Sequence, residues 1–262
     1  MKATLFGHLD RPAVAVVGVW DPLLPGHRDL FRSISAYTRE ANLAPLVIVL
    51  DPDPARFVWG VAELPIYNDV RWRIAEIRRC GMNGVLLVRF RKADLLASAE
   101  QWLELVATKV PLAELWLGAR QTLGRGSGGT FEAVAALGQQ NGICVKRLSF
   151  VPLRTYDVRE HLAAGRIQMA EDLVGTPPIW GRPRSGFLRL AWCPGRYRAV
   201  ALTSAVQEEP TAPEFEVCGV PESNGLARFE WPNPRIRYLR FVSGPGDVRA
   251  SPGSGGEMLK FK

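Results

Sequence analysis

The hydrophobic residues in the first two-thirds of the chain form short unbroken runs, and segments with helical spacing separate these runs. The runs are rich in Val, Leu and Ile and cover residues 13–19, 45–51, 84–90, 113–118 and 143–151. The intervening segments cover residues 28–42, 69–81, 98–110 and 130–142. Strands without polar alternation are typical of a parallel sheet that helices cover on both faces. The pattern therefore predicts an α/β domain with a parallel sheet over residues 1–182.

The pattern changes near Pro183. Short β-like runs cover residues 187–202, 214–220, 226–232 and 236–242, and Gly, Pro, Ser and Asn separate them without an intervening helix. Such a pattern predicts a small β-rich, barrel-like module over residues 183–245. The segment 246–262 is rich in Gly, Ser and Pro, which predicts a flexible C-terminal tail. A short strand pairing of residues 258–261 is the alternative for part of this tail.

Composition narrows the class of protein. The chain has 262 residues, 47% of them hydrophobic, which is enough to bury a substantial core. No apolar run approaches the roughly 20 residues that cross a bilayer, and the N-terminal segment lacks the apolar centre of a secretion signal. We therefore expect a cytoplasmic protein without a membrane partner. The four cysteines occur singly, which favours reduced thiols over a zinc site or a disulfide framework.

The net charge of +7 raises the alternative of nucleic-acid binding. Arginines are spread along the chain among acidic residues, and no block of five or six like charges occurs. A basic protein that binds a polyphosphate has the same charge sign, so we favour small-molecule ligands, a nucleotide and an acceptor, over nucleic acid. The sequence leaves the oligomeric state open, and a homo-oligomer is one alternative.

The first apolar run leads into the segment "GVWDPLLPGH", which starts at Gly18. Ligands of open parallel sheets bind beyond the carboxyl ends of the strands, where this segment lies. Gly18 allows close backbone approach, Asp21 can reach into the crevice, and Trp20 can stack on a flat ring. Gly26 and His27 begin a helix, whose N-terminus favours phosphate. The alternative is a tight strand-to-helix loop in which Gly supplies a turn and His caps the helix.

Four motifs in this order resemble those of the FAD synthetase (FMN adenylyltransferase) family, which belongs to the HxGH nucleotidyltransferases. The family's G-x-F-D-G-x-H-x-G-H is similar to "GVWDPLLPGH" at 18–27, and its F-D-P-H-P is similar to "LDPDP" at 50–54. Its G-x-D-F-x-F-G and basic glycine-rich loop resemble "GARQTLGRGSGG" at 118–129. Its S-S-T-x-I-R and A-x-x-L-G-x-P resemble the ends of "RTYDVREHLAAGRIQMAEDLVGTPP" at 154–178.

The resemblance implies a Rossmann-like nucleotidyltransferase domain that transfers AMP from ATP to FMN or another phosphate- or carboxylate-bearing acceptor. Pyrophosphate is released, Mg²⁺ assists, and FMN or FAD is a bound ligand. The catalytic residues it implies are His27, Arg159 and Arg154. The nucleotide-binding residues it implies are Gly18, Val19, Trp20, Asp21, Gly26, His27, Gly118, Arg120, Arg125 and Arg159. The acceptor-binding residues it implies are Asp51, Asp53 and Tyr156, and no residue is assigned to a metal.

The chain departs from these motifs at several positions. Leu24 stands where the first motif has a histidine, Asp53 replaces the histidine of F-D-P-H-P, and Arg120 replaces an acid. Arg154 and Tyr156 replace two hydroxyl-bearing residues. If the chain still adenylylates FMN, we expect Arg154, Arg120 and Arg125 to supply the positive charge that the missing imidazole would have provided, because guanidinium groups bind phosphate.

Two functional classes stay open. One is a working, specialised nucleotidyltransferase. The other is a catalytically degenerate module of the same family that binds a flavin, a nucleotide or a partner protein. The C-terminal module lacks the G-x-P-T-A-N signature of riboflavin kinases, so we expect a reduced barrel without kinase activity.

Overall fold

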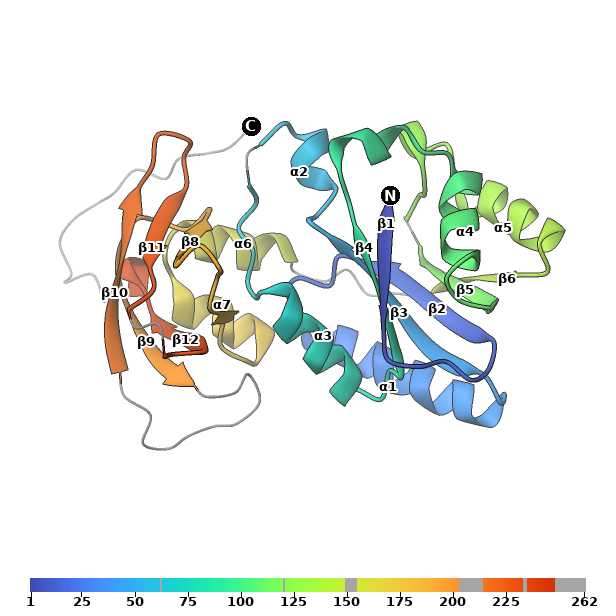
Figure 1. Cartoon of the computed structure of the whole chain (residues 1–262), viewed down its shortest axis with the longest axis horizontal. Coiled ribbons are helices and arrows are strands. Elements are labelled where there is room, and N and C mark those ends of the chain that lie inside the picture. The colour runs from blue at the N-terminus through green and yellow to red at the C-terminus, as the bar shows by residue number, and fades with distance from the viewer. Residues whose placement is uncertain (62, 120, 149–154, 203–213, 233–234, 248–262) are drawn as a thin grey trace.

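The computed structural model describes residues 1–61, 63–119, 121–148, 155–202, 214–232 and 235–247. The chain forms two six-stranded sheets (Figure 1). The first sheet has the strand order β1-β4-β3-β2-β5-β6. Its strands are β1 (Lys2–Phe6), β2 (Ala13–Gly18), β3 (Ala44–Asp51), β4 (Gly84–Arg89), β5 (Leu112–Gly118) and β6 (Cys144–Leu148). Strands β2 to β6 are mutually parallel, so the predicted α/β class is confirmed.

Helices cover both faces of this sheet, as the unbroken apolar runs predicted. The covering helices are α1 (Pro25–Glu40), α3 (Val70–Arg79), α4 (Ala99–Ala107) and α5 (Phe131–Gln140). The connecting segments also form the four-residue helix α2 (Ala55–Val58), which has no buried residue, and the 3₁₀ turns η1 (Lys92–Leu96) and η2 (Arg125–Ser127). Alternate residues of β2 pack on opposite faces. Val14 and Val16 contact the layer of α1 and α3, whereas Ala15 and Val17 contact the layer of α4 and α5. Among the described residues, no helix combines the length and apolar character that a bilayer-spanning segment requires.

Strand β1 was not predicted. It pairs antiparallel with β4 at one edge of the sheet, so the sheet is mixed rather than wholly parallel. Its five residues alternate between exposed and half-buried positions, in contrast to the fully buried runs of the inner strands. A short edge strand buries one face only, so it lacks the continuous apolar run by which the other strands were recognised.

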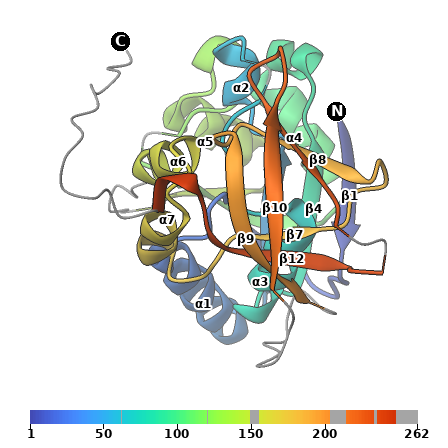
Figure 2. The same ribbon diagram turned by 90° about the vertical axis from the view of Figure 1, so that its left-hand side faces the viewer.

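The second sheet is antiparallel throughout and strongly curved (Figure 2), which confirms the predicted β-rich, barrel-like module. Its order is β7-β12-β9-β10-β11-β8. The strands are β7 (Ile179–Gly181), β8 (Phe187–Leu190), β9 (Gly195–Leu202), β10 (Glu214–Pro221), β11 (Ala227–Glu230) and β12 (Tyr238–Ser243), followed by η3 (Pro245–Asp247). This sheet begins at Ile179, slightly before the boundary expected at residue 183. The tail expected to be flexible falls outside the described residues from 248 onwards.

Helices α6 (Thr155–Ala163) and α7 (Ile167–Val174) precede the second sheet and pack on it (Figure 1). Val158 and Leu162 of α6 share a core cluster with Tyr197 and Phe241 of the second sheet. Helix α6 therefore belongs by packing to the second sheet, although its sequence continues the nucleotidyltransferase motifs.

A polar seam joins the two sheets. The carboxylate of Asp21, which follows β2, accepts hydrogen bonds from the backbone N–H groups of Tyr67 and Asn68 at 2.9 and 3.0 Å. The side-chain oxygen of Asn68 accepts a hydrogen bond from Ile179 N–H at 2.5 Å. Asp69 accepts one from Gly181 N–H at 2.7 Å. The loop at residues 67–69 thus holds β7 against the carboxyl end of the first sheet.

We predict that Asn68→Ala lowers the free energy of unfolding by about 1–3 kcal/mol, because the variant leaves the buried N–H of Ile179 without its acceptor. Urea denaturation followed by tryptophan fluorescence measures this loss. Asn83→Ala, at an exposed position, is the matched control and should change stability by less than about 0.5 kcal/mol. Equal stability of the two variants would contradict a structural role for this bond.

Candidate functional site

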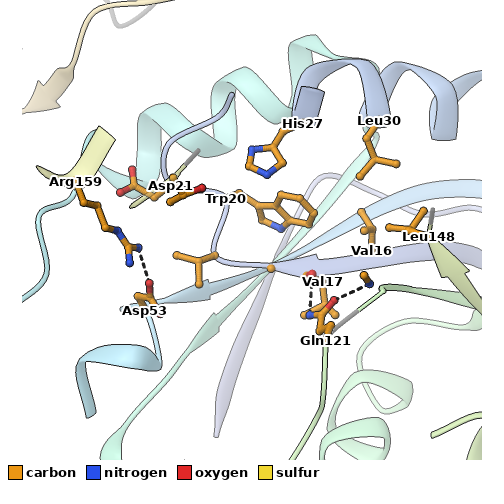
Figure 3. Close-up of a pocket in the computed structure, with 14 residues that line it drawn as sticks. Val16, Val17, Trp20, Asp21, His27, Leu30, Asp53, Gln121, Leu148 and Arg159 are labelled. Atoms are coloured by element: carbon orange, nitrogen blue, oxygen red, sulfur yellow. Dashed lines mark hydrogen bonds and ion pairs between the residues drawn. The ribbon is translucent and has the colours of Figure 1, made fainter. Parts of the chain in front are cut away.

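A cavity of about 370 Å³ opens at the carboxyl ends of β2 and β5 (Figure 3). The chain order reverses between these strands, since β3 and β4 lie on one side of β2 and β5 and β6 lie on the other. Open α/β sheets bind ligands at such a switch point, and the volume lies in the range of small-molecule sites. The lining residues are Val16, Val17, Gly18, Val19, Trp20, Asp21, His27, Leu30, Asp53, Gly118, Gln121, Leu148, Thr155 and Arg159.

Trp20 forms a central wall of the cavity. Its backbone has a φ of +57°, and its indole N–H donates to the carbonyl of Ile48 at 3.0 Å. The ring folds back over Gly18, where an added Cβ would lie only 2.8 Å from the indole. Gly18 is therefore required by the indole, whereas the sequence suggested that it makes room for a ligand. Trp20 is mostly buried, with 8% of its surface exposed to solvent.

Asp21 lies at the edge of the cavity and is 4% exposed. Burial raises the pKa of its carboxyl group, and the charge of Arg73 and the N–H groups of Tyr67 and Asn68 oppose that rise. Both carboxylate oxygens accept backbone hydrogen bonds. Asp21 therefore fixes the loop that follows β2 rather than extending freely into the cavity.

His27 stands in the first turn of α1, with its imidazole ring over the edge of Trp20 (Figure 3). Its Nδ1 lies 3.2 Å from both the N–H of Leu24 and the carbonyl of Pro22, and the tautomer decides which bond forms. Burial and, to a smaller extent, the nearby charge of Arg28 lower the pKa of His27 to about 4, although the hydrogen bond with the Pro22 carbonyl opposes this shift. The imidazole is therefore neutral near pH 7 and brings hydrogen-bonding groups rather than charge to the cavity.

Arg159 and Asp53 form an ion pair at one side of the cavity (Figure 3). Arg159 Nη2 donates to Asp53 Oδ2 at 2.6 Å, and the two side chains are 15% and 11% exposed. Arg159 comes from α6, whereas Asp53 lies between β3 and α2. The structure therefore brings together two predicted residues that are 106 positions apart.

Gln121 is a cavity residue that sequence reasoning missed. Its side-chain N–H donates to the carbonyl of Val17 at 3.1 Å, and its side-chain oxygen accepts from Gly118 N–H at 3.1 Å. The backbone pairing of β2 with β5 ends one residue earlier, at Val16. The carboxamide thus bridges the two strands at the floor of the cavity. A polar residue soon after a buried strand was its only signal in the sequence.

Several expected site residues lie elsewhere. Asp51 pairs with Arg73 and Arg89, each at 2.6 Å. Tyr156 is 61% exposed on α6 and does not line the cavity. Gly26 and Arg125 are also absent from the lining, although Gly118, Val19 and the other described nucleotide-site residues are present. Arg120 and Arg154 lie outside the described residues.

Leu24, at the position of the first motif histidine, does not line the cavity. Its side chain is 3% exposed and packs in the core cluster with Tyr67, Val158 and Leu162. It therefore points into the apolar contact between the first domain and α6, not into the cavity. Of the three arginines expected to supply the missing charge, the structure describes Arg125, which lies on η2 and does not line the cavity. For Arg120 and Arg154 the expectation stays a prediction.

The described residues contain no group of three His, Cys, Asp or Glu side chains arranged to hold a metal ion. Magnesium in nucleotide sites is bound largely by substrate phosphates and water, with one or two carboxylates. Asp53 and Asp21 are the described carboxylates at the cavity, and both already accept hydrogen bonds from protein groups.

Comparison with known proteins identifies relatives for most of the first domain. A family model described as FAD synthetase matches residues 7–160. The bifunctional riboflavin kinase/FMN adenylyltransferase of Escherichia coli (strain K12) is 25% identical over 171 residues, which cover 63% of this chain and 54% of that protein. The same-named protein of Buchnera aphidicola (subsp. Acyrthosiphon pisum) is 23% identical over 169 residues, covering 62% and 54%. The chain thus spans about half the length of these curated relatives.

A solved structure extends the likeness in fold to the second sheet. The crystal structure of a macrolide-efflux protein from Streptococcus pneumoniae covers 97% of this chain and 89% of that chain. The TM-score is 0.58 at 15% sequence identity, so the likeness concerns the fold alone.

We predict that Leu24→His destabilises the protein and does not restore a phosphate contact. The substitution puts a polar ring at a buried apolar position, at a cost of about 1–3 kcal/mol. Urea denaturation measures this cost, and Leu96→His, at a position that is 69% exposed, is the control. Wild-type stability together with tighter nucleotide binding in Leu24→His would show that the side chain reaches the cavity.

We also predict a pH dependence of stability from His27. Its pKa is about 4 in the folded state and near 6.5 in the unfolded chain, so the unfolded state binds the extra proton between these values. The stabilising contribution is complete above about pH 6.5 and is lost as the pH falls toward 4. In urea titrations over this range, His27→Gln should show a shallower rise of stability with pH than the wild type. Replacement of the exposed His8 by Gln should leave the slope unchanged.

Proposed function

This chain belongs to the FAD synthetase family, whose model matches more than half of its residues, and we propose that it binds ATP in the cavity and transfers the adenylyl group. One observation carries the proposal. The first-motif residues Gly18, Asp21 and His27 line a single cavity together with Arg159, at the switch point of the sheet. The acceptor we propose is FMN or another molecule that bears a phosphate or carboxylate.

In the proposed reaction, an acceptor oxygen attacks the α-phosphorus of ATP. The bond from this phosphorus to the oxygen that bridges to the β-phosphate breaks, and pyrophosphate leaves with the electron pair. Such chemistry needs no covalent enzyme intermediate, so the protein acts by positioning and by stabilising charge. Bound magnesium would neutralise phosphate charge during the reaction.

The chain's own residues have distinct tasks in this proposal. The N-terminus of the 16-residue helix α1 favours an anion at the cavity. The neutral imidazole of His27 donates a hydrogen bond to a phosphoryl oxygen when Nε2 carries the proton, and Nδ1 then accepts from Leu24 N–H. Arg159 offers guanidinium N–H groups from the side of α6, where Asp53 balances its charge. Trp20, Val16 and Leu148 provide the apolar surface for a base or ring.

The second candidate is a family-derived binding module without catalysis. Two observations favour it. Leu24 is buried away from the cavity, so no second imidazole acts beside His27, and Arg159 is already paired with a carboxylate. Both candidates require nucleotide or flavin binding in the same cavity, so binding alone does not separate them.

We predict that the protein binds MgATP and that His27→Ala or Arg159→Ala weakens this binding by tenfold to a hundredfold. A hydrogen bond to a charged group contributes about 1.5–3 kcal/mol, which corresponds to that range. Isothermal titration calorimetry measures the dissociation constants. Arg32→Ala removes the same charge from an exposed site on α1 and should leave affinity within twofold. Parallel losses of melting temperature and affinity would indicate a structural role for His27 or Arg159.

Pyrophosphate release separates the two candidates. Release that requires both ATP and an acceptor supports the transferase, and a panel with FMN and other phosphate or carboxylate compounds identifies the acceptor. With FMN we expect weak FAD formation, because only His27 remains of the two motif histidines. Tight nucleotide binding without release for any acceptor would favour the binding module.

A further inference from the structure

The ion pair between Asp53 and Arg159 lies in the wall of the cavity, and both partners are mostly buried. Asp53 is held from two sides. Its Oδ1 accepts a hydrogen bond from the N–H of Ala55 at 2.9 Å, and this bond directs Oδ2 toward Arg159 at 2.6 Å. The carboxylate is therefore fixed by the backbone at the start of α2 and does not depend on Arg159 for its position.

The pair uses part of the hydrogen-bonding capacity of Arg159. Nη2 donates to Asp53, and the buried Nε has no hydrogen-bond partner among the described residues. A phosphate binds a guanidinium best through two parallel N–H groups. A phosphate that approaches Arg159 must therefore share its Nη edge with Asp53 or displace the carboxylate from it.

The charges that line the cavity favour Asp53 over an incoming phosphate as the partner of Arg159. Among the described residues that line the cavity, Arg159 is the only lysine or arginine, whereas Asp53 and Asp21 both contribute carboxyl groups. His27 is neutral near pH 7. A bare polyphosphate entering the cavity meets a cation that is already neutralised at 2.6 Å, in a partly buried place where solvent screens charge poorly.

We propose that Asp53 is a specificity-determining residue that restrains Arg159 and so lowers the affinity of the cavity for anions that bring no countercharge. The cavity then discriminates in favour of metal-complexed nucleotide over free polyphosphate. The identity of the natural ligand rests on the proposed function. The competition between Asp53 and an anion for Arg159 does not. It concerns this chain in particular, since Asp53 stands where the matching motif has a histidine.

The test compares the wild type with Asp53→Asn by titration with metal-free inorganic pyrophosphate in the presence of a chelator. Asparagine keeps an oxygen for Ala55 N–H and removes the charge that holds Arg159. We expect the dissociation constant for pyrophosphate to fall at least tenfold. Asp29→Asn makes the same change in net charge at an exposed position on α1 and should change affinity less than twofold.

A second variant and a double variant keep the result interpretable. Asp53→Ser also retains a side-chain oxygen for the Ala55 N–H, and it replaces Asp53→Asn if the asparagine variant does not fold. Adding Arg159→Gln to either should remove the gain in pyrophosphate affinity, since the gain is assigned to the released guanidinium. Unchanged or weaker pyrophosphate binding in the folded Asp53 variants would overturn the inference.

Titration with MgATP distinguishes this inference from the proposed function. Wild-type protein that fails to bind MgATP would refute the proposed function, whereas a gain for pyrophosphate in Asp53→Asn would still support the restraint on Arg159. For the wild type, we expect MgATP to bind at least tenfold more tightly than metal-free pyrophosphate. Asp53→Asn should reduce the ratio of MgATP affinity to pyrophosphate affinity. An unchanged ratio would count against discrimination by Asp53.

Discussion

The carboxylate of Asp21 accepts two backbone hydrogen bonds, from Tyr67 and Asn68, and the arrangement of both sheets around the cavity depends on these bonds. Burial of this group is costly and raises its pKa, and two N–H groups and the nearby Arg73 oppose that rise. These two hydrogen bonds fix the position of the loop that follows β2. Trp20 and His27, on either side of Asp21, are then fixed against each other, and Asn68 carries the constraint on to β7.

The second sheet contributes to the cavity without lining it. Helix α6 carries Arg159, and Val158 and Leu162 of the same helix pack in the core that the second sheet provides. Leu24 extends this core toward the start of α1, so the two helix N-termini that flank the cavity share one apolar contact. The substitution of leucine for the motif histidine therefore has a packing explanation. It replaces a polar group near the cavity by a side chain that joins the two domains.

Much of the first domain was predictable, because buried parallel strands produce unbroken apolar runs and the first motif follows one of them. Strand β1 was not, since an edge strand of five half-exposed residues has no such run. The location of the cavity could be predicted from the strand end at Gly18. The contacts between its lining residues could not. The left-handed backbone of Trp20 and the role of Gln121 depend on neighbouring strands, and Asp53 meets Arg159 only through the tertiary fold. The family resemblance implied phosphate contact at Arg159, whereas its carboxylate partner could be found only in the folded structure.

The electrostatics of the described site bear on how adenylyl transfer would proceed there. A neutral imidazole and a guanidinium paired with a carboxylate provide hydrogen bonds and orientation, but little net positive charge. Charge that develops on the phosphates must then be balanced by the dipole of α1 and by cations that arrive with the substrate. In our proposal, such a site selects ligands that bring their own countercharge, because an anion without one must share Arg159 with Asp53 or displace the carboxylate from it. Under this proposal, the geometry that weakens general anion binding favours a metal-bound nucleotide as the ligand of the cavity.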